Sequence, residues 1–156
     1  MSFEEIYHTY WPRIYRLCMG FVNDVDWAKD ITQETFVTVW QKLDSFRNES
    51  NISTWIFRIA TNNCLRQIET QKRLPKTELK FEIADQVLPS LEGQTAFLYE
   101  CIAQLSETER IIISLELEDL KQAEIAKIVG ISEANVRVKI FRIKEKLTEK
   151  FKYYER

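Results

Sequence analysis

Residues 122–144 read QAEIAKIVGISEANVRVKIFRIK, and this stretch decides the fold. Ile125 belongs to the apolar stripe of a first helix, and Ala126 is small where a second helix would cross closely. Gly130 suits a turn that requires a positive φ, which side chains resist. Ser132 can accept a hydrogen bond from the first turn of the following helix. The order of these residues predicts a helix-turn-helix.

The second helix of this motif has two faces of opposite character. Its buried stripe is predicted to contain Val136, Ile140, Ile143 and Leu147. Its other face carries Glu133, Arg137, Lys139 and Arg142, residue types that read base edges and hold phosphates in the major groove. A plain helical hairpin with a solvated basic face is the alternative, but the glycine and the cap in register favour the DNA-binding motif.

The remaining chain also predicts helices. Apolar residues recur at three- and four-residue steps over residues 3–21, 28–43, 53–70, 91–105 and 106–115. Only 3 Gly and 3 Pro interrupt the chain of 156 residues, so the fold class is all-α.

The helix boundaries carry their own signals. Pro12 is expected to kink the first helix or to begin a second one. Either Asp24 or Asp26 can cap the next helix, and Ser53 or Thr54 the third. Ser-Glu-Thr-Glu at residues 106–109 matches a capping box.

The helices divide into two groups. Periodicity fades after residue 71, where two prolines stand among mixed charges. We therefore expect two small helical domains, residues 1–71 and 90–156, joined by a flexible linker at residues 72–89.

Charge is unevenly distributed along the chain. The net charge is -2, but residues 137–156 hold 8 Lys/Arg against 3 Asp/Glu, whereas residues 90–136 hold 3 against 9. This asymmetry indicates one surface for phosphates and others for a basic protein partner, although ordinary solvated helix faces would give a similar count.

Several classes of protein are disfavoured. The cysteines Cys18, Cys64 and Cys101 lack metal-ligand spacing, so we expect no metal site, no cofactor and a reducing, cytoplasmic location. His8 is the single histidine, and no glycine-rich phosphate loop occurs, so neither an enzyme nor a small-molecule substrate is expected. We see no signal peptide and no apolar run long enough to insert in a membrane.

Three blocks of sequence are similar to those of one family. They are AKDITQETFVTVW at residues 28–40, STWIFRIATN at residues 53–62, and LSETER at residues 105–110 followed by the helix-turn-helix. Their order and separation resemble those of the extracytoplasmic-function (ECF) sigma factors of bacterial RNA polymerase. The resemblance implies a sigma region 2-like helical bundle and a sigma region 4-like helix-turn-helix domain, and it covers nearly the whole chain except the linker.

The resemblance also implies partners and site residues. By this resemblance, the residues expected to dock on the clamp helices of the largest subunit of core RNA polymerase are Asp30, Gln33, Glu34, Val37 and Trp40. Those expected to open and read the −10 promoter element are Phe46, Arg47, Asn48, Asn51, Ser53, Thr54, Trp55, Arg58, Asn62 and Arg66. Those expected to read the −35 duplex are Ser132, Glu133, Asn135, Arg137, Val138, Lys139, Phe141 and Arg142. An anti-sigma protein is expected as a regulator.

One departure concerns the −10 region. Arg66 stands where many family members carry an acidic residue, and Glu69 replaces part of a basic run. Phosphate contact would then rely on Arg58, Arg66, Lys72 and Arg73.

Two other functions remain open on sequence alone. A stand-alone helix-turn-helix regulator with an N-terminal sensor or dimerisation domain would bind duplex DNA by itself, on a two-fold site. A helical protein that sequesters a partner is the third class. The polar face at residues 30–41 disfavours the stand-alone regulator, and the basic face of the last helix disfavours the sequestering protein.

Overall fold

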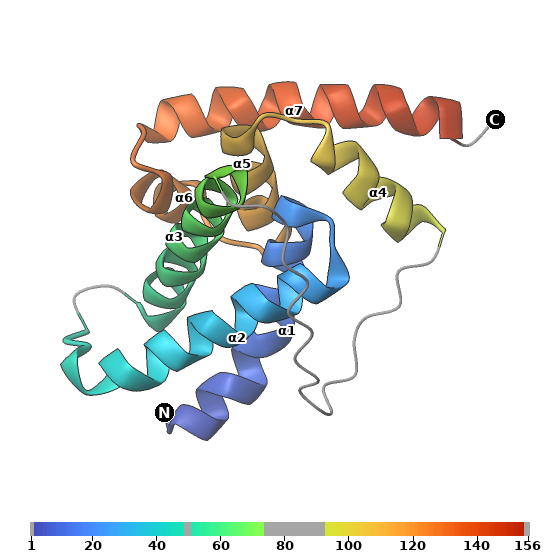
Figure 1. Ribbon diagram of the computed structural model, residues 1–156. Helices are drawn as coiled ribbons and strands as arrows, with labels where there is room; N and C mark the ends of the chain where they lie inside the picture. The colour runs from blue at the N-terminus through green and yellow to red at the C-terminus, as the bar shows by residue number, and fades with distance from the viewer. Residues whose placement is uncertain (1, 49–50, 74–92, 155–156) are drawn as a thin grey trace.

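A computed structural model describes residues 2–48, 51–73 and 93–154 of the chain. This part is helical and contains no strand, so the all-α prediction is confirmed. The helices are α1 (Phe3–Val22), α2 (Val25–Lys42), a 3-10 turn η1 (Leu43–Ser45), α3 (Ile52–Arg73), α4 (Gln94–Ala103), α5 (Glu107–Leu117), α6 (Gln122–Val129) and α7 (Glu133–Tyr154). Figure 1 shows α7 lying across one end of the molecule, with α1 and α2 at the other.

Most helix starts follow the sequence signals. Asp24 caps α2 by accepting a hydrogen bond from the Trp27 amide at 2.9 Å. At Ser106 the capping box is complete, because the Ser106 and Glu109 side chains each accept from the other residue's amide. Pro12 lies inside an uninterrupted α1, so the alternative of a second helix starting there is wrong.

The cap of α3 differs from the prediction. Asn51, rather than Ser53 or Thr54, supplies the capping oxygen, since its Oδ1 accepts from the Thr54 amide at 2.8 Å. The helix therefore begins at Ile52, two residues earlier than a cap at Ser53 would start it, and it continues to Arg73. Residues 72 and 73 of the expected linker are thus helical, and residues 74–89 lie outside the described residues.

Two groups of helices form the core. The first group packs α1 on α2 and α3, and the second packs α5 on α6 and α7. The sequence did not reveal that the two groups also pack on each other, α1 against α4 and α5, and α3 against α6. Their buried side chains form one continuous cluster. Because a domain of this size buries a modest share of its surface alone, the additional contact extends both cores.

The capping box gives a stability prediction. Ser106→Ala removes the acceptor for the Glu109 amide and should lower the free energy of unfolding by about 1 kcal/mol. Chemical denaturation followed by circular dichroism measures this loss. Thr108→Ala, an exposed position in the same turn, is the matched control. Equal stability of the two variants would show that the box contributes nothing.

Candidate nucleic-acid interface

The helix-turn-helix has the local geometry that its sequence predicts. Gly130 has a φ of 82°, and its amide donates to the Ala126 carbonyl at 2.8 Å, which ends α6. Ser132 then accepts from the Asn135 amide at 3.1 Å and starts α7. A residue with a side chain would be strained at position 130, so glycine is favoured at the end of α6.

The outward side of this motif is the α7 face, formed by the eight predicted −35 residues. All are exposed except Lys139, which is half-buried, and Phe141 is 65% exposed. Its members are Ser132, Glu133, Asn135, Arg137, Val138, Lys139, Phe141 and Arg142. Exposed apolar side chains beside basic ones suit contact with thymine methyl groups and with guanine or phosphate oxygens.

The basic residues of α7 fall into two classes. Lys144 pairs with Glu116 at 3.3 Å, and Lys146 pairs with Glu109 at 2.9 Å. The hydrogen bond from Lys146 lowers the pKa of the Glu109 carboxyl. In the described part of the chain, Arg137, Lys139 and Arg142 have no acidic partner.

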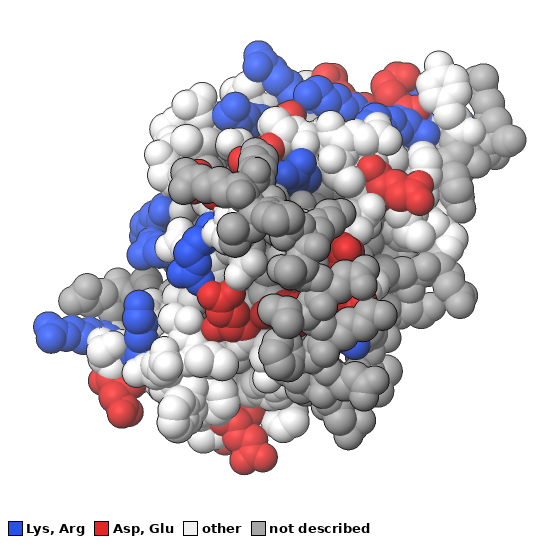
Figure 2. Space-filling model, in the orientation of Figure 1, with Lys and Arg blue, Asp and Glu red and all other residues white. Residues whose placement is uncertain are grey.

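Most of the uncompensated positive charge therefore lies in the N-terminal half of α7, since further along only Lys150 has a neutral partner, Gln104, in the described residues. The charge count along the sequence could not separate these residues from the paired lysines that follow. Figure 2 shows Lys and Arg side chains along α7, with Asp and Glu side chains close to several of them.

The predicted −10 residues form the α3 surface around the start of α3. Exposed members are Arg47, Asn48, Asn51, Asn62 and Arg66, and half-buried members are Phe46, Ser53, Trp55 and Arg58. The rings of Phe46 and Trp55 lie 4.8 Å apart between centroids. Paired aromatic rings beside exposed Arg and Asn side chains can stack on and hydrogen-bond to unpaired bases.

Two members of the α3 surface differ from their expected setting. Thr54 is 2% exposed and its hydroxyl donates to Asn51, so it positions Asn51 rather than offering a contact of its own. Arg66 forms an ion pair with Glu34 and also donates to Asn63. Arg66, predicted to contact DNA, is thus ion-paired with Glu34, predicted to contact polymerase.

The predicted polymerase residues lie along the outward side of α2 and form the α2 face. Val37 is 49% and Trp40 66% exposed, which is unusual for large apolar side chains. Asp30 is exposed, and the pKa of its carboxyl is raised by partial burial and by the charges of Asp26 and Asp24. A concentration of negative charge beside exposed apolar groups suits a partner that is basic and partly apolar.

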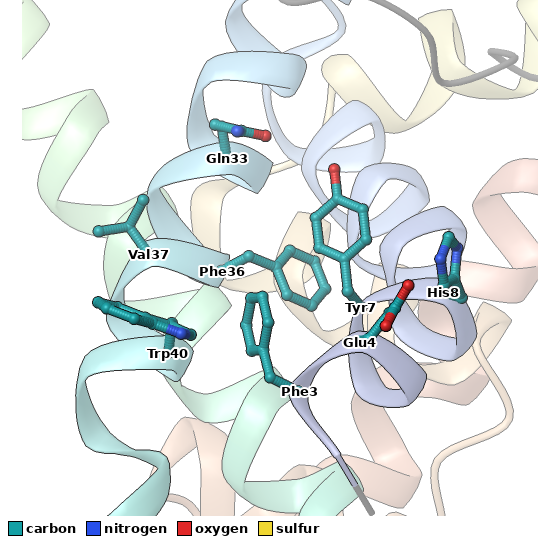
Figure 3. A pocket seen from close by; sticks show the side chains of 8 residues that line it. All are labelled: Phe3, Glu4, Tyr7, His8, Gln33, Phe36, Val37 and Trp40. Atoms are coloured by element: carbon teal, nitrogen blue, oxygen red, sulfur yellow. The ribbon is translucent and has the colours of Figure 1, made fainter.

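The α2 face borders a shallow pocket of about 540 Å³. Figure 3 shows that α1 contributes the opposite wall, through Phe3, Glu4, Tyr7 and His8. Sequence reasoning missed this wall because Phe3 and Tyr7 fit the periodic stripe of a buried helix face, whereas both are half-buried here.

The described residues offer no group of side chains that could hold a metal ion. Cys18, Cys64 and Cys101 are buried free thiols, and His8 is exposed beside Tyr7.

Among the described helices, none combines the length and apolar character required to cross a bilayer.

Comparison with known proteins shows that each half of the chain matches a protein family. Residues 6–74 match the family Sigma-70 region 2, and residues 98–147 match Sigma-70, region 4. The ECF RNA polymerase sigma factor SigW of Bacillus subtilis is 31% identical over 97% of this chain and 89% of its own. The RNA polymerase sigma-H factor of Pseudomonas aeruginosa is 29% identical over 92% of this chain and 83% of its own.

Solved structures share the fold over nearly the whole chain. The sigma factor RpoE of Bartonella quintana, in complex with the anti-sigma factor NepR, gives a TM-score of 0.72 at 21% identity and covers 96% of each chain. CnrH, in complex with the cytosolic domain of CnrY, gives 0.66 at 22% identity, over 97% of this chain and 88% of its own. Together with the two family matches and their order, the likeness to SigW shows that the chain belongs to the ECF family of RNA polymerase sigma factors.

Proposed function

We propose that this sigma factor binds core RNA polymerase through the α2 face and reads promoter DNA at two places. The α3 surface reads the melted −10 element, and the α7 face reads the −35 element as duplex. Direction of polymerase to promoters is the activity of the family. The assignment of that activity to these residues is the proposal.

One observation carries the assignment. The α7 face keeps Arg137 and Arg142 without an acidic partner in the described chain, while Lys144 and Lys146, further along the same helix, are neutralised by α5. Unpaired cations at the start of a recognition helix are placed to meet base edges and phosphates. The exposed Trp40 and the acidic Asp30 on α2 supply a separate surface of opposite charge.

The domain limits follow the same division. We assign residues 1–71 to the polymerase-docking and −10-reading domain, 72–89 to a linker, and 90–156 to the −35-reading domain. Because α3 ends at Arg73, the end of the first domain is better placed at residue 73 than at residue 71.

The remaining properties follow from this role. The chain works without a catalytic centre or a cofactor, and it acts where polymerase acts, in the cytoplasm. An anti-sigma protein holds it inactive, a proposal supported by the sigma factor RpoE of the same fold, which was solved with the anti-sigma factor NepR. A stand-alone regulator is disfavoured because residues 6–74 match Sigma-70 region 2 rather than a sensor or dimerisation domain.

Run-off transcription tests the function. With purified core polymerase and a promoter library, the chain should direct initiation from a defined subset of promoters, and alone it should bind the same duplexes weakly. Tight and specific binding of a palindromic duplex by the isolated chain, with no effect on core polymerase, would support the regulator instead.

Arginine truncation tests the α7 face. Arg137→Ala or Arg142→Ala should weaken recognition of the −35 element by about 1–3 kcal/mol, because each removes a potential base contact. Competition between promoters in run-off assays measures the change in selectivity. Lys146→Ala, whose side chain is paired with Glu109, should leave selectivity intact. If both arginine variants select promoters as the wild type does, the α7 face does not read DNA.

Charge reversal tests the α2 face. Asp30→Lys should weaken binding to core polymerase while the circular dichroism spectrum stays unchanged, because the side chain is exposed. Glu69→Lys, an exposed acid on α3, is the control with the same change of charge. Undiminished assembly of the Asp30 variant would remove this residue from the docking surface.

A further inference from the structure

The outward side of α7 is apolar at its centre. Successive residues of an α-helix are rotated by about 100°, because about 3.6 residues make one turn. Val136 and Ile143 are buried, so Val138 points in nearly the opposite direction, away from the domain. Ala134 and Phe141 lie beside it at helical spacing, and all three side chains are exposed, Val138 by 45% and Phe141 by 65%. We call Ala134, Val138 and Phe141 the apolar stripe.

The polar residues of the α7 face lie away from this centre. Ser132 accepts a hydrogen bond from the Asn135 amide and serves as the helix cap. Asn135 and Lys139 lie one turn apart on one flank of the helix, and Lys139 is half-buried. The centre of the outward side therefore offers no hydrogen-bonding side chain to a base, and recognition there depends on apolar contact.

Arginines border the apolar stripe. Arg137 precedes Val138 and Arg142 follows Phe141, and neither arginine has an acidic partner among the residues that the structure describes. Because unpaired cations attract phosphates, the stripe is directed to a nucleic acid. A stable protein interface buries about 800 Å² on each partner, and one exposed phenylalanine with one exposed valine supplies only a small part of that area.

Apolar side chains are selective in the major groove. Among the four bases, only thymine presents an apolar group there, its 5-methyl group. Valine and phenylalanine can neither donate nor accept a hydrogen bond, so their contact would leave the amino group of adenine or cytosine without a partner. Contact with a thymine methyl group instead removes apolar area from water on both sides.

The spacing along α7 indicates how many base pairs the stripe covers. Val138 and Phe141 are three residues apart, about 4.5 Å along the helix axis at about 1.5 Å per residue. Base pairs of a duplex lie about 3.4 Å apart, so the two side chains can meet neighbouring base pairs. Glu145 is the next residue on the outward side, and its negative charge opposes phosphates, so contact with DNA ends near Arg142.

We propose that Val138 and Phe141 determine the base preference at the −35 element by contacting the 5-methyl groups of thymines on neighbouring base pairs. Arg137 and Arg142 hold guanines or phosphates beside them. The thymines can stand on either strand, because both strands present base edges in the major groove. This inference rests on the proposed function and deepens it, since it names the bases that the α7 face selects.

Removal of single methyl groups tests the contact. A promoter library randomised over the −35 region is incubated with holoenzyme assembled from core polymerase and the wild-type chain. The promoters recovered should carry thymines on neighbouring base pairs. Replacing one of these thymines by deoxyuridine removes the methyl group and keeps every hydrogen-bonding group of the base. Binding by the holoenzyme should weaken about fourfold for each contacted methyl group, the factor for one methyl group that is no longer buried.

Truncation of the two side chains assigns each methyl group. With Val138→Ala, one thymine should lose its advantage over deoxyuridine, and with Phe141→Ala the neighbouring thymine should lose it. Leu117→Ala is the matched control, because Leu117 is an apolar side chain of the same domain, 48% exposed on α5. This control should keep both methyl effects. Circular dichroism should be unchanged in all three variants, since alanine favours helix.

A change of base preference is the complementary test. Val138→Gln places an amide at the centre of the outward side, and a glutamine amide can pair with N6 and N7 of adenine. Selection from the same library should then shift from thymine towards adenine at one position of the −35 element. An unchanged preference at every position would show that Val138 does not face a base.

The inference is overturned if deoxyuridine replaces every −35 thymine without loss of binding, or if the loss is equal in the wild type and in both truncated α7 variants. It is also overturned if these truncations weaken binding to core polymerase or change the oligomeric state, because the stripe would then contact protein. A wild-type holoenzyme that initiates from no promoter of the library would instead overturn the proposed function, so the two failures are distinguishable.

Discussion

The charge of Glu118 is the constraint on which the arrangement of the two domains depends. The Glu118 carboxylate is only 6% exposed and requires cationic partners, and Arg13 and Arg16 supply them from the other domain. The pairing joins the end of α5 to α1, at an interface where Gly20 lies against Ser114 and Asn51 hydrogen-bonds to Glu124 of α6. Removal of one charge would therefore loosen a contact that spans both domains.

The distribution of ion pairs also assigns different roles to the two halves of α7. Towards its C-terminus, Lys144 and Lys146 are held by acids of α5 and tie the helix to its own domain. Near its start, Arg137 and Arg142 remain available. A single helix thus stabilises its own domain at its C-terminal end and can contact DNA at its N-terminal end. Because unpaired cations lie together at that N-terminal end, a net charge of -2 is compatible with DNA binding.

Local features were predictable from sequence, and contacts between distant residues were not. The turn at Gly130 and the cap at Ser132 depend on neighbouring residues, so their geometry could be read from the motif. The pairing of Arg66 with Glu34 joins residues 32 positions apart, and no periodicity indicates it. The packing of α1 on α5 was missed for the same reason. Asn51 displaced Ser53 as the cap because both residue types can fill that role, and tertiary context decided between them.

The most direct test of this account is the distance between the two domains as core polymerase is added. Fluorescent labels at Glu69→Cys in α3 and Thr148→Cys in α7 occupy exposed positions, while the native cysteines are buried. Because the two domains pack on each other and are proposed to read separate promoter elements, energy transfer should be efficient in the free chain and clearly lower when the promoter complex forms. Unchanged transfer in a complex that initiates transcription would contradict it.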